Sequence, residues 1–123
     1  MRQVVLDTNF ILTAIKNKID FIEGVTFLGL TPIVPEQVIA ELEKIVESKK
    51  KLKFKDDARL GLKILSKKKI KKIDLKNDYV DNGLIAYSEQ NKSAIIATMD
   101  KELKSKIPNQ RLIIRAKKRL EII

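Results

Sequence analysis

Short apolar runs alternate along this chain with longer segments whose apolar side chains recur at helical spacing. Residues 4–6 form a continuous apolar run, as in a strand buried on both faces, whereas residues 8–17 carry an apolar stripe of helical period. Such alternation predicts βαβ units and an α/β fold with a parallel sheet covered by helices on both faces. The expected strands are residues 3–6, 31–35, 70–75, 94–98 and 111–114, and the expected helices are residues 8–17, 20–25, 35–48, 56–66, 78–91 and 101–106.

Lysine-rich segments separate some of these elements. Residues 49–55 and residues 67–72 each hold five lysines. We expect residues 49–55 to form a solvated loop and the residues after 114 to form a basic C-terminal tail. A chain of 123 residues is long enough for one compact domain, residues 1–123, and too short for two.

Composition removes several kinds of chemistry. The chain has no cysteine and no histidine, which excludes disulfides, cysteine-ligated zinc, Ser-His-Asp and Cys-His catalysis, and histidine-based ribonuclease chemistry. The formal net charge of +10 suits a polyanion such as nucleic acid, although a lysine-rich surface is also a thermophile trait. The longest uncharged run, residues 24–35, is too short to span a bilayer, and the N-terminus lacks the layout of a signal peptide. We therefore expect a cytoplasmic protein that does not enter a membrane.

Two of the predicted strands end in aspartate. Asp7 follows the first strand, and Asp100 follows the strand at residues 94–98. Ligands of open α/β sheets bind beyond the carboxyl ends of the strands, so we expect both carboxylates in one crevice. Each aspartate also precedes a predicted helix, where it is a favourable N-cap, and either residue taken alone fits both roles equally well.

Further carboxylates lie on the predicted helices. Asp81 falls on the apolar side of its helix, which faces the sheet, where a carboxylate is costly without a partner or an open helix end. The alternative for Asp81 is a first-turn acid stabilised by the helix dipole, and Asp78 fits either role. Glu41 and Glu43 flank the apolar stripe of an earlier helix, and periodicity does not choose between them.

A cluster of such carboxylates requires protons or a cation. Two carboxylates about 4 Å apart repel by roughly 4 kcal/mol at an effective dielectric of about 20. Hard oxygen ligands favour Mg²⁺ or Mn²⁺, which can orient water and stabilise charge at a phosphate. The acidic residues therefore predict metal-assisted phosphate chemistry on a basic protein without histidine.

Four segments in order along the chain resemble the motifs of the PIN-domain nucleases. They are residues 4–12, 35–42, 79–86 and 96–103. Each motif is weak alone, but all four in order in a chain of this length are a fairly specific signal. Met99 departs from the pattern, because related sequences often have a polar residue there.

The resemblance implies a Rossmann-like fold and a metal-dependent endoribonuclease. It selects Glu41 over Glu43, and it gives Asn9 and Thr98 supporting roles in orienting carboxylates or water. Asp78 lies outside the pattern and remains a further supporting candidate. The expected cofactor is one or two Mg²⁺ or Mn²⁺ ions, and the products should carry 5′-phosphate and 3′-hydroxyl ends. The implied catalytic and metal-binding residues are Asp7, Glu41, Asp81 and Asp100.

Within this family, the start of the chain and its basic end are most similar to small archaeal relatives of the ribosome-biogenesis PIN nucleases. Ribosomal RNA precursor would then be the substrate. The alternatives are a VapC-type toxin that cleaves tRNA or rRNA under the control of an antitoxin, and a non-catalytic RNA-binding scaffold. Expected protein partners are a second copy of the chain, an antitoxin or a ribosome-assembly protein. Phospho-acceptor and haloacid-dehalogenase chemistry would need a further acid where Thr8 or Asn9 stands.

Basic side chains in three places are candidates for contacts with RNA phosphates. The alternative for each group is a solvated charged surface. If the groups bind, affinity for single strands should fall with salt, with a log–log slope of about −0.7 per phosphate. The candidates are Lys49, Lys50, Lys51, Lys67, Lys68, Lys69, Arg115, Lys117, Lys118 and Arg119.

Overall fold

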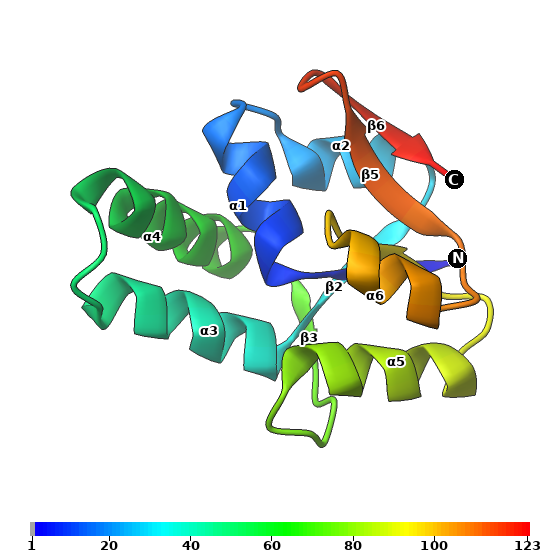
Figure 1. The fold of residues 1–123 in the computed structure, drawn as a ribbon. Coiled ribbons are helices and arrows are strands. Elements are labelled where there is room, and N and C mark those ends of the chain that lie inside the picture. Colours follow the sequence, from blue (N-terminus) through cyan, green and yellow to red (C-terminus); the bar gives the residue numbers. More distant parts are fainter. Residues whose placement is uncertain (1) are drawn as a thin grey trace.

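The computed structural model describes residues 2–123, and in that part of the chain six strands form one sheet (Figure 1). In chain order they are β1 (Gln3–Leu6), β2 (Thr31–Pro35), β3 (Lys71–Ile73), β4 (Ile95–Ala97), β5 (Arg111–Arg115) and β6 (Arg119–Ile122). Their order across the sheet is β3-β2-β1-β4-β5-β6, and all neighbours pair in parallel except the antiparallel pair β5 and β6. The predicted parallel sheet is confirmed, with one antiparallel strand added at its edge.

Helices connect the parallel strands. In chain order they are α1 (Thr8–Lys16), α2 (Phe21–Phe27), α3 (Glu36–Glu47), α4 (Leu52–Lys67), α5 (Val80–Gln90) and α6 (Lys101–Lys106). Within residues 2–123, no helix combines the length and the apolar character needed to cross a membrane.

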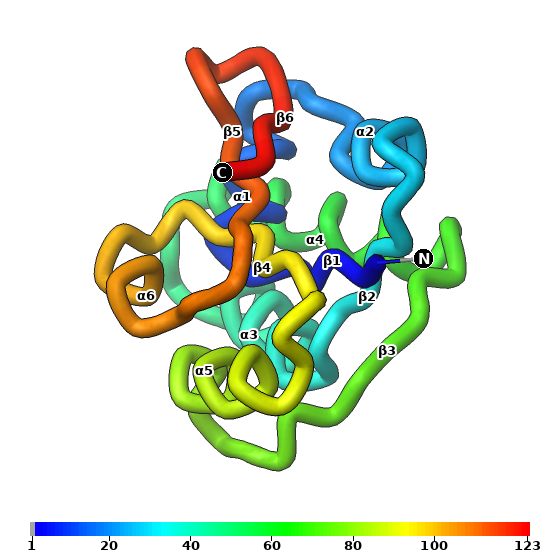
Figure 2. Tube along the Cα trace, turned by 90° about the vertical axis from the view of Figure 1, so that its right-hand side faces the viewer, coloured from blue at the N-terminus to red at the C-terminus, as the bar shows by residue number. Residues whose placement is uncertain are grey.

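The order of the strands places the helices on both faces of the sheet. The chain steps outward from β1 to β2 and β3, then returns to β4 on the other side of β1 and continues to β5. Because parallel crossovers are right-handed, α1 to α4 cover one face, and α5 and α6 cover the other. Accordingly, α1 packs against α3 and α4, and α5 packs against α6. Figure 2 shows α5 and α6 together, across β1 and β4 from α2.

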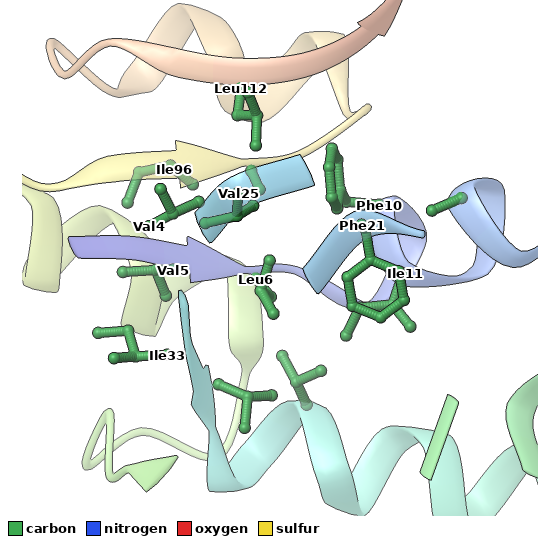
Figure 3. Packing of buried hydrophobic residues seen from close by; sticks show 14 of the residues in the cluster. Val4, Val5, Leu6, Phe10, Ile11, Phe21, Val25, Ile33, Ile96 and Leu112 are labelled. Atoms are coloured by element: carbon green, nitrogen blue, oxygen red, sulfur yellow. The ribbon is translucent and has the colours of Figure 1, made fainter. Parts of the chain in front are cut away.

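The core is built around β1. Its residues Val4, Val5 and Leu6 are fully buried, which explains why this strand is a continuous apolar run. Figure 3 shows these side chains beside Ile33 of β2 and Ile96 of β4. Burial of a side chain of this kind stabilises the fold by roughly 1.5–3 kcal/mol. The strand that carries the first aspartate is therefore firmly held at the centre of the sheet.

Residues 49–55 were expected to form a loop, and this expectation is wrong for their second half. The helix α4 begins at Leu52, and the other expected elements agree with the structure within two residues. Lysine is a good helix former, so the lysines around Phe54 are compatible with a helix. The apolar stripe of this helix already begins at Phe54, which is earlier than expected. The stripe packs closely on α1, since a Cβ added at Gly61 would lie 3.2 Å from Ile11 and Ile15. It consists of Phe54, Ala58, Gly61 and Leu65.

The basic end of the chain is not a tail but the second half of a β-hairpin. Leu120 and Ile122 of β6 pair with Ile114 and Leu112 of β5. The residues of the turn do not indicate a hairpin, although both central residues, Ala116 and Lys117, have positive φ angles of 55° and 57°. Turns of this kind usually carry Asn-Gly or Asp-Gly, so their ordinary signal is missing here.

Candidate active site

The aspartate at the end of β1 is buried beyond the carboxyl end of the sheet. Asp7 is 3% exposed, and its backbone N–H donates to the carbonyl oxygen of Ala97, 3.0 Å away, which extends the pairing of β1 with β4. Because the strand order reverses between β1 and β4, this edge is the topological switch point of the sheet, where open α/β folds bind ligands.

Both carboxylate oxygens of Asp7 accept hydrogen bonds. Oδ1 accepts from the backbone N–H of Thr8 at 2.8 Å, and Oδ2 accepts from the hydroxyl of Thr98 at 2.8 Å. The expected N-cap role is present, since Asp7 caps α1. The pKa of Asp7 is nevertheless raised to about 6, chiefly by burial and also by the charges of Asp81 and Glu41, although the two hydrogen bonds lower it. A capping role alone does not explain a carboxylate buried beside two others.

Three of the four predicted acids line one pocket of about 430 Å³, namely Asp7, Glu41 and Asp81. Glu41 comes from α3 and is held by the Thr8 hydroxyl, which donates to its Oε1. Periodicity left Glu41 and Glu43 equivalent, but Glu43 lines a different pocket, between α3 and α4. The pocket therefore joins the end of β1 with α3 and α5.

Asp81 reaches this pocket from the first turn of α5. It is exposed there, so the expectation that it lies on the side facing the sheet is corrected: it occupies the open end of the helix. Partial burial raises the pKa of Asp81, and the charges of Asp100 and Glu102 raise it further. Asp78 lies before α5, is exposed, and is not among the residues that line the acidic pocket.

Asp100 stands beside the acidic pocket and lines a neighbouring hollow instead. Its Oδ1 caps α6 by accepting from the backbone N–H groups of Glu102 and Leu103 at 2.9 and 3.3 Å. Thr98 joins the two aspartates, because its hydroxyl donates to Asp7 and accepts from the backbone N–H of Asp100 at 3.1 Å. Asn9 Oδ1 accepts from the backbone N–H of Met99 at 3.0 Å and so ties α1 to the same loop.

The donor set of the pocket fits a hard divalent cation. Within residues 2–123, no three carboxylates converge closely enough to surround one ion. Mg²⁺, however, usually keeps several waters and is bound through only one or two carboxylates. An ion held in this way would use one or two of the three carboxylates that line the pocket, those of Asp7, Glu41 and Asp81, and its charge would relieve their mutual repulsion.

Sequence reasoning missed several residues that shape the pocket. Thr8 positions Glu41, and its place directly after Asp7 gave no sign of that contact. Lys44 lies one turn after Glu41 on α3 and adds a positive charge to the lining. The predicted supporting residue Asn9 also lines the pocket, and the remaining lining is apolar and comes from Leu12, Ile45 and Phe54.

The predicted RNA-contact lysines lie at opposite ends of α4. Lys49 to Lys51 precede the helix at the end that carries Phe54, and the Lys50 ammonium lies 5.7 Å from the centre of the Phe54 ring. Lys67 to Lys69 lie at the other end, about 24 Å along a helix of 16 residues, just before β3 begins. Only the first group adjoins the acidic pocket.

The other predicted basic residues belong to the hairpin. Arg115 forms an ion pair with Glu121, 2.8 Å from Nε to Oε2, so its charge already has a partner. Lys117 and Lys118 lie in the turn, and Arg119 begins β6, all of them exposed.

Comparisons with known proteins agree with this geometry. A family model described as "PIN like domain" matches residues 4–119. Ribonuclease VapC4 of Methanocaldococcus jannaschii is 32% identical over 128 residues, which cover 99% of this chain and 97% of that protein. The rRNA-processing protein FCF1 of Saccharomyces cerevisiae is 34% identical over 110 residues, 85% of this chain and 53% of that protein. The chain thus spans about half the length of FCF1.

Solved structures share the fold. The PIN domain endonuclease Utp24 superposes with a TM-score of 0.79 and 26% identity, over 98% of this chain and 90% of that one. VapBC2 from Rickettsia felis, bound to a DNA fragment from their promoter, gives a TM-score of 0.52 at 22% identity, over 87% of this chain and 94% of that one. The second comparison supports the fold alone.

Proposed function

This chain belongs to the PIN-domain ribonuclease family, and we propose that it is an endoribonuclease that depends on Mg²⁺ or Mn²⁺. The observation that supports the proposal is the pocket lined by Asp7, Glu41 and Asp81, in which burial raises the pKa of Asp7 to about 6. Enzymes of this family are generally dependent on divalent metals, and the basic protein around the pocket suits an RNA substrate.

The residues of the chain prepare the pocket for a phosphodiester. Thr8 and Thr98 fix the Asp7 carboxylate through both oxygens, and the Thr8 hydroxyl fixes Glu41 as well. A bound divalent ion would supply positive charge that orients water and stabilises the developing charge on the phosphate. Lys44 offers a second positive charge in the same lining. Asp100 contributes through its charge beside Asp81 and through the loop that Thr98 holds.

We propose ribosomal RNA precursor as the substrate class. The support is the likeness to the rRNA-processing protein FCF1 and to the endonuclease Utp24. A ribosome-assembly protein would be a natural partner in that role.

A toxin ribonuclease held by an antitoxin is the second candidate. It is favoured by one observation, that this chain covers 97% of the length of Ribonuclease VapC4. Expression of the chain alone in a host cell separates the two roles. A toxin should arrest growth, and Asp7→Asn should relieve the arrest, whereas a processing enzyme should leave growth unchanged.

Cleavage of a structured rRNA fragment tests the proposed activity. The reaction should be compared in Mn²⁺, in Mg²⁺ and in EDTA, for the wild type and Asp7→Asn, with tRNA and unstructured RNA as further substrates. We expect metal-dependent cutting that the variant loses, with 5′-phosphate and 3′-hydroxyl ends. Ends with 2′,3′-cyclic phosphate would contradict the metal-assisted mechanism. Binding of RNA by both forms without any cutting would instead favour a non-catalytic scaffold.

A further inference from the structure

An apolar groove lies where α3 and α4 meet the edge of the sheet. The two helices pack side by side (Figure 1), and β3 forms that edge. The groove has a volume of about 600 Å³, which is within the range of ligand sites in proteins, about 300–1,000 Å³. Ile39, Leu62 and Ile70 line it and are half-buried, so aliphatic surface is open to an occupant. We call this surface the α3–α4 groove and define it by these three residues with Lys69 and Lys72.

Positive charge surrounds the aliphatic floor of the groove. Lys69 and Lys72 are exposed in its lining, and they belong to the segment at residues 67–72, which holds five lysines. Within residues 2–123, none of these five lysines forms a salt bridge. Glu43 adds one negative charge to the lining, and the balance stays positive. The groove therefore complements an occupant that carries apolar and acidic groups together.

Lys69 is held at the groove by the way in which α4 ends. The backbone N–H of Ile70 donates to the carbonyl oxygen of Leu65 at 3.1 Å, and Lys69 has a positive φ of 51°. Glycine is the usual residue at this position of a helix end, because a residue with a Cβ is strained there. The backbone of Lys69 is thus fixed, and its charge is presented from a strained position.

The chemistry of the groove favours a protein segment over RNA. The apolar side chains that line it in the described part of the chain are all aliphatic, whereas the bases of single strands bind chiefly by stacking on aromatic rings. Among residues 2–123, the groove and the acidic pocket share no lining residue. RNA would contact the lysines alone, but a peptide with acidic and apolar side chains would contact both the lysines and the floor.

We propose that the α3–α4 groove binds an acidic segment of a partner protein. The apolar side chains of that segment enter the groove, and its carboxylates pair with Lys69 and Lys72. The lysines of residues 67–72 then serve a protein partner, in place of the RNA contacts expected from the sequence. This surface goes beyond the proposed cleavage and does not depend on it, because it lies outside the acidic pocket.

Selection of phage-displayed random peptides on the whole chain, in EDTA and without RNA, tests the groove. The most enriched peptide is then labelled, and its Kd is measured by fluorescence anisotropy across a salt series. We expect a peptide that combines Asp or Glu with large apolar side chains. Its binding to the wild type should weaken as salt is added, because the lysines are exposed.

Lys69→Gly separates binding from folding. It removes a charge from the groove and relieves the positive φ, so we expect binding about tenfold weaker and a melting temperature about 4 °C higher. The matched control is Lys18→Gly. Lys18 follows α1 with a φ of 56°, at a helix end where the backbone N–H of Ile19 donates to the carbonyl oxygen of Ala14, and it lies outside the groove. This control should melt at a similarly raised temperature and bind the peptide as the wild type does.

Leu62→Ala tests the apolar floor of the groove. It removes half-buried aliphatic surface, and we expect it to weaken peptide binding about tenfold. The control is Leu60→Ala, because Leu60 lies on the same helix, is 46% exposed and does not line the groove. Thermal melts of both variants verify that they are folded.

Three results would each overturn the proposal: no enriched peptide, enriched peptides that lack acidic residues, or equal affinity for the wild type and Lys69→Gly. A labelled single-stranded RNA that binds Lys69→Gly more weakly, but binds Lys18→Gly as it binds the wild type, would assign the lysines to nucleic acid and would also overturn it. Because the peptide assay contains neither metal nor RNA, failure of the proposed cleavage leaves its result standing. Conversely, a cleaving enzyme whose groove variants bind peptide normally refutes only the groove.

Discussion

Replacement of Asp7 by asparagine should stabilise the fold while it abolishes the proposed cleavage. The pKa of Asp7 is raised from 3.8 to about 6, chiefly by burial, so ionised Asp7 is held in the folded protein at a free-energy cost. One pKa unit corresponds to about 1.4 kcal/mol, which makes this cost about 3 kcal/mol. Asparagine carries no charge and avoids it.

The hydrogen bonds around position 7 can survive this substitution. The backbone N–H of Thr8 can still donate to the side-chain oxygen. The Thr98 hydroxyl, which donates to Asp7 Oδ2, can turn to accept from the new amide and donate toward Asn9 Oδ1 at 3.4 Å. The free energy of unfolding of Asp7→Asn should therefore rise by almost the full cost of the ionised carboxylate.

The pH dependence gives this prediction its sign. Well below pH 3.8 the carboxyl is protonated in both states, and the charge cost is absent. As the pH rises through the unfolded pKa of 3.8 toward the folded pKa of about 6, the unfolded state ionises first, so the wild type loses stability relative to the variant. The advantage of Asp7→Asn should be about half of its full value at pH 5 and complete at pH 8.

Urea unfolding in EDTA between pH 5 and pH 8 measures this difference. The control Asp78→Asn changes an exposed carboxylate and should leave the free energy of unfolding within about 0.5 kcal/mol of the wild type. Added Mg²⁺ or Mn²⁺ should stabilise the wild type more than Asp7→Asn, because only the native wild-type pocket gains a ligand. A variant that is no more stable than the wild type at pH 8, or whose gain does not vary with pH, would refute the reasoning.

Three other substitutions probe separate parts of the molecule. Thr8→Val should lower cleavage about tenfold with little change in melting temperature, because Glu41 loses the hydroxyl that holds its carboxylate. Thr8→Ser keeps the hydroxyl and should retain activity. Equal losses of activity in the two variants would contradict this role of Thr8. Gly83→Ala should destabilise the fold by about 1–3 kcal/mol in urea unfolding, since its Cβ would lie 2.8 Å from Leu75 Cβ; a more stable variant would show that α5 shifts freely. Ala116→Gly should raise the free energy of unfolding by about 1 kcal/mol, because φ at this position is 55°, and a loss of stability there would argue against the left-handed turn.

Local signals in the sequence predicted most of the fold. Continuous apolar runs such as the one in β1 occur where a strand is buried on both faces, and helical stripes occur where one face is buried. Chain order and right-handed crossovers then bring the ends of β1 and β4 together, as expected. Asp7 and Asp100 were expected in one crevice, but they line neighbouring hollows. The hairpin at the basic end escaped prediction because its turn places Ala116 and Lys117 in a conformation that residue type does not favour.

The sequence by itself determined which residues carry charge, which strands are buried and which acids lie at strand ends. These properties follow from the composition and from the spacing of apolar side chains over a few neighbouring residues. Only the tertiary structure decided that Thr8 holds Glu41 and that Asp100 lines a different hollow from Asp7. Those facts join residues from separate elements. The distances and the burial that set a pKa exist only after the sheet and helices have packed.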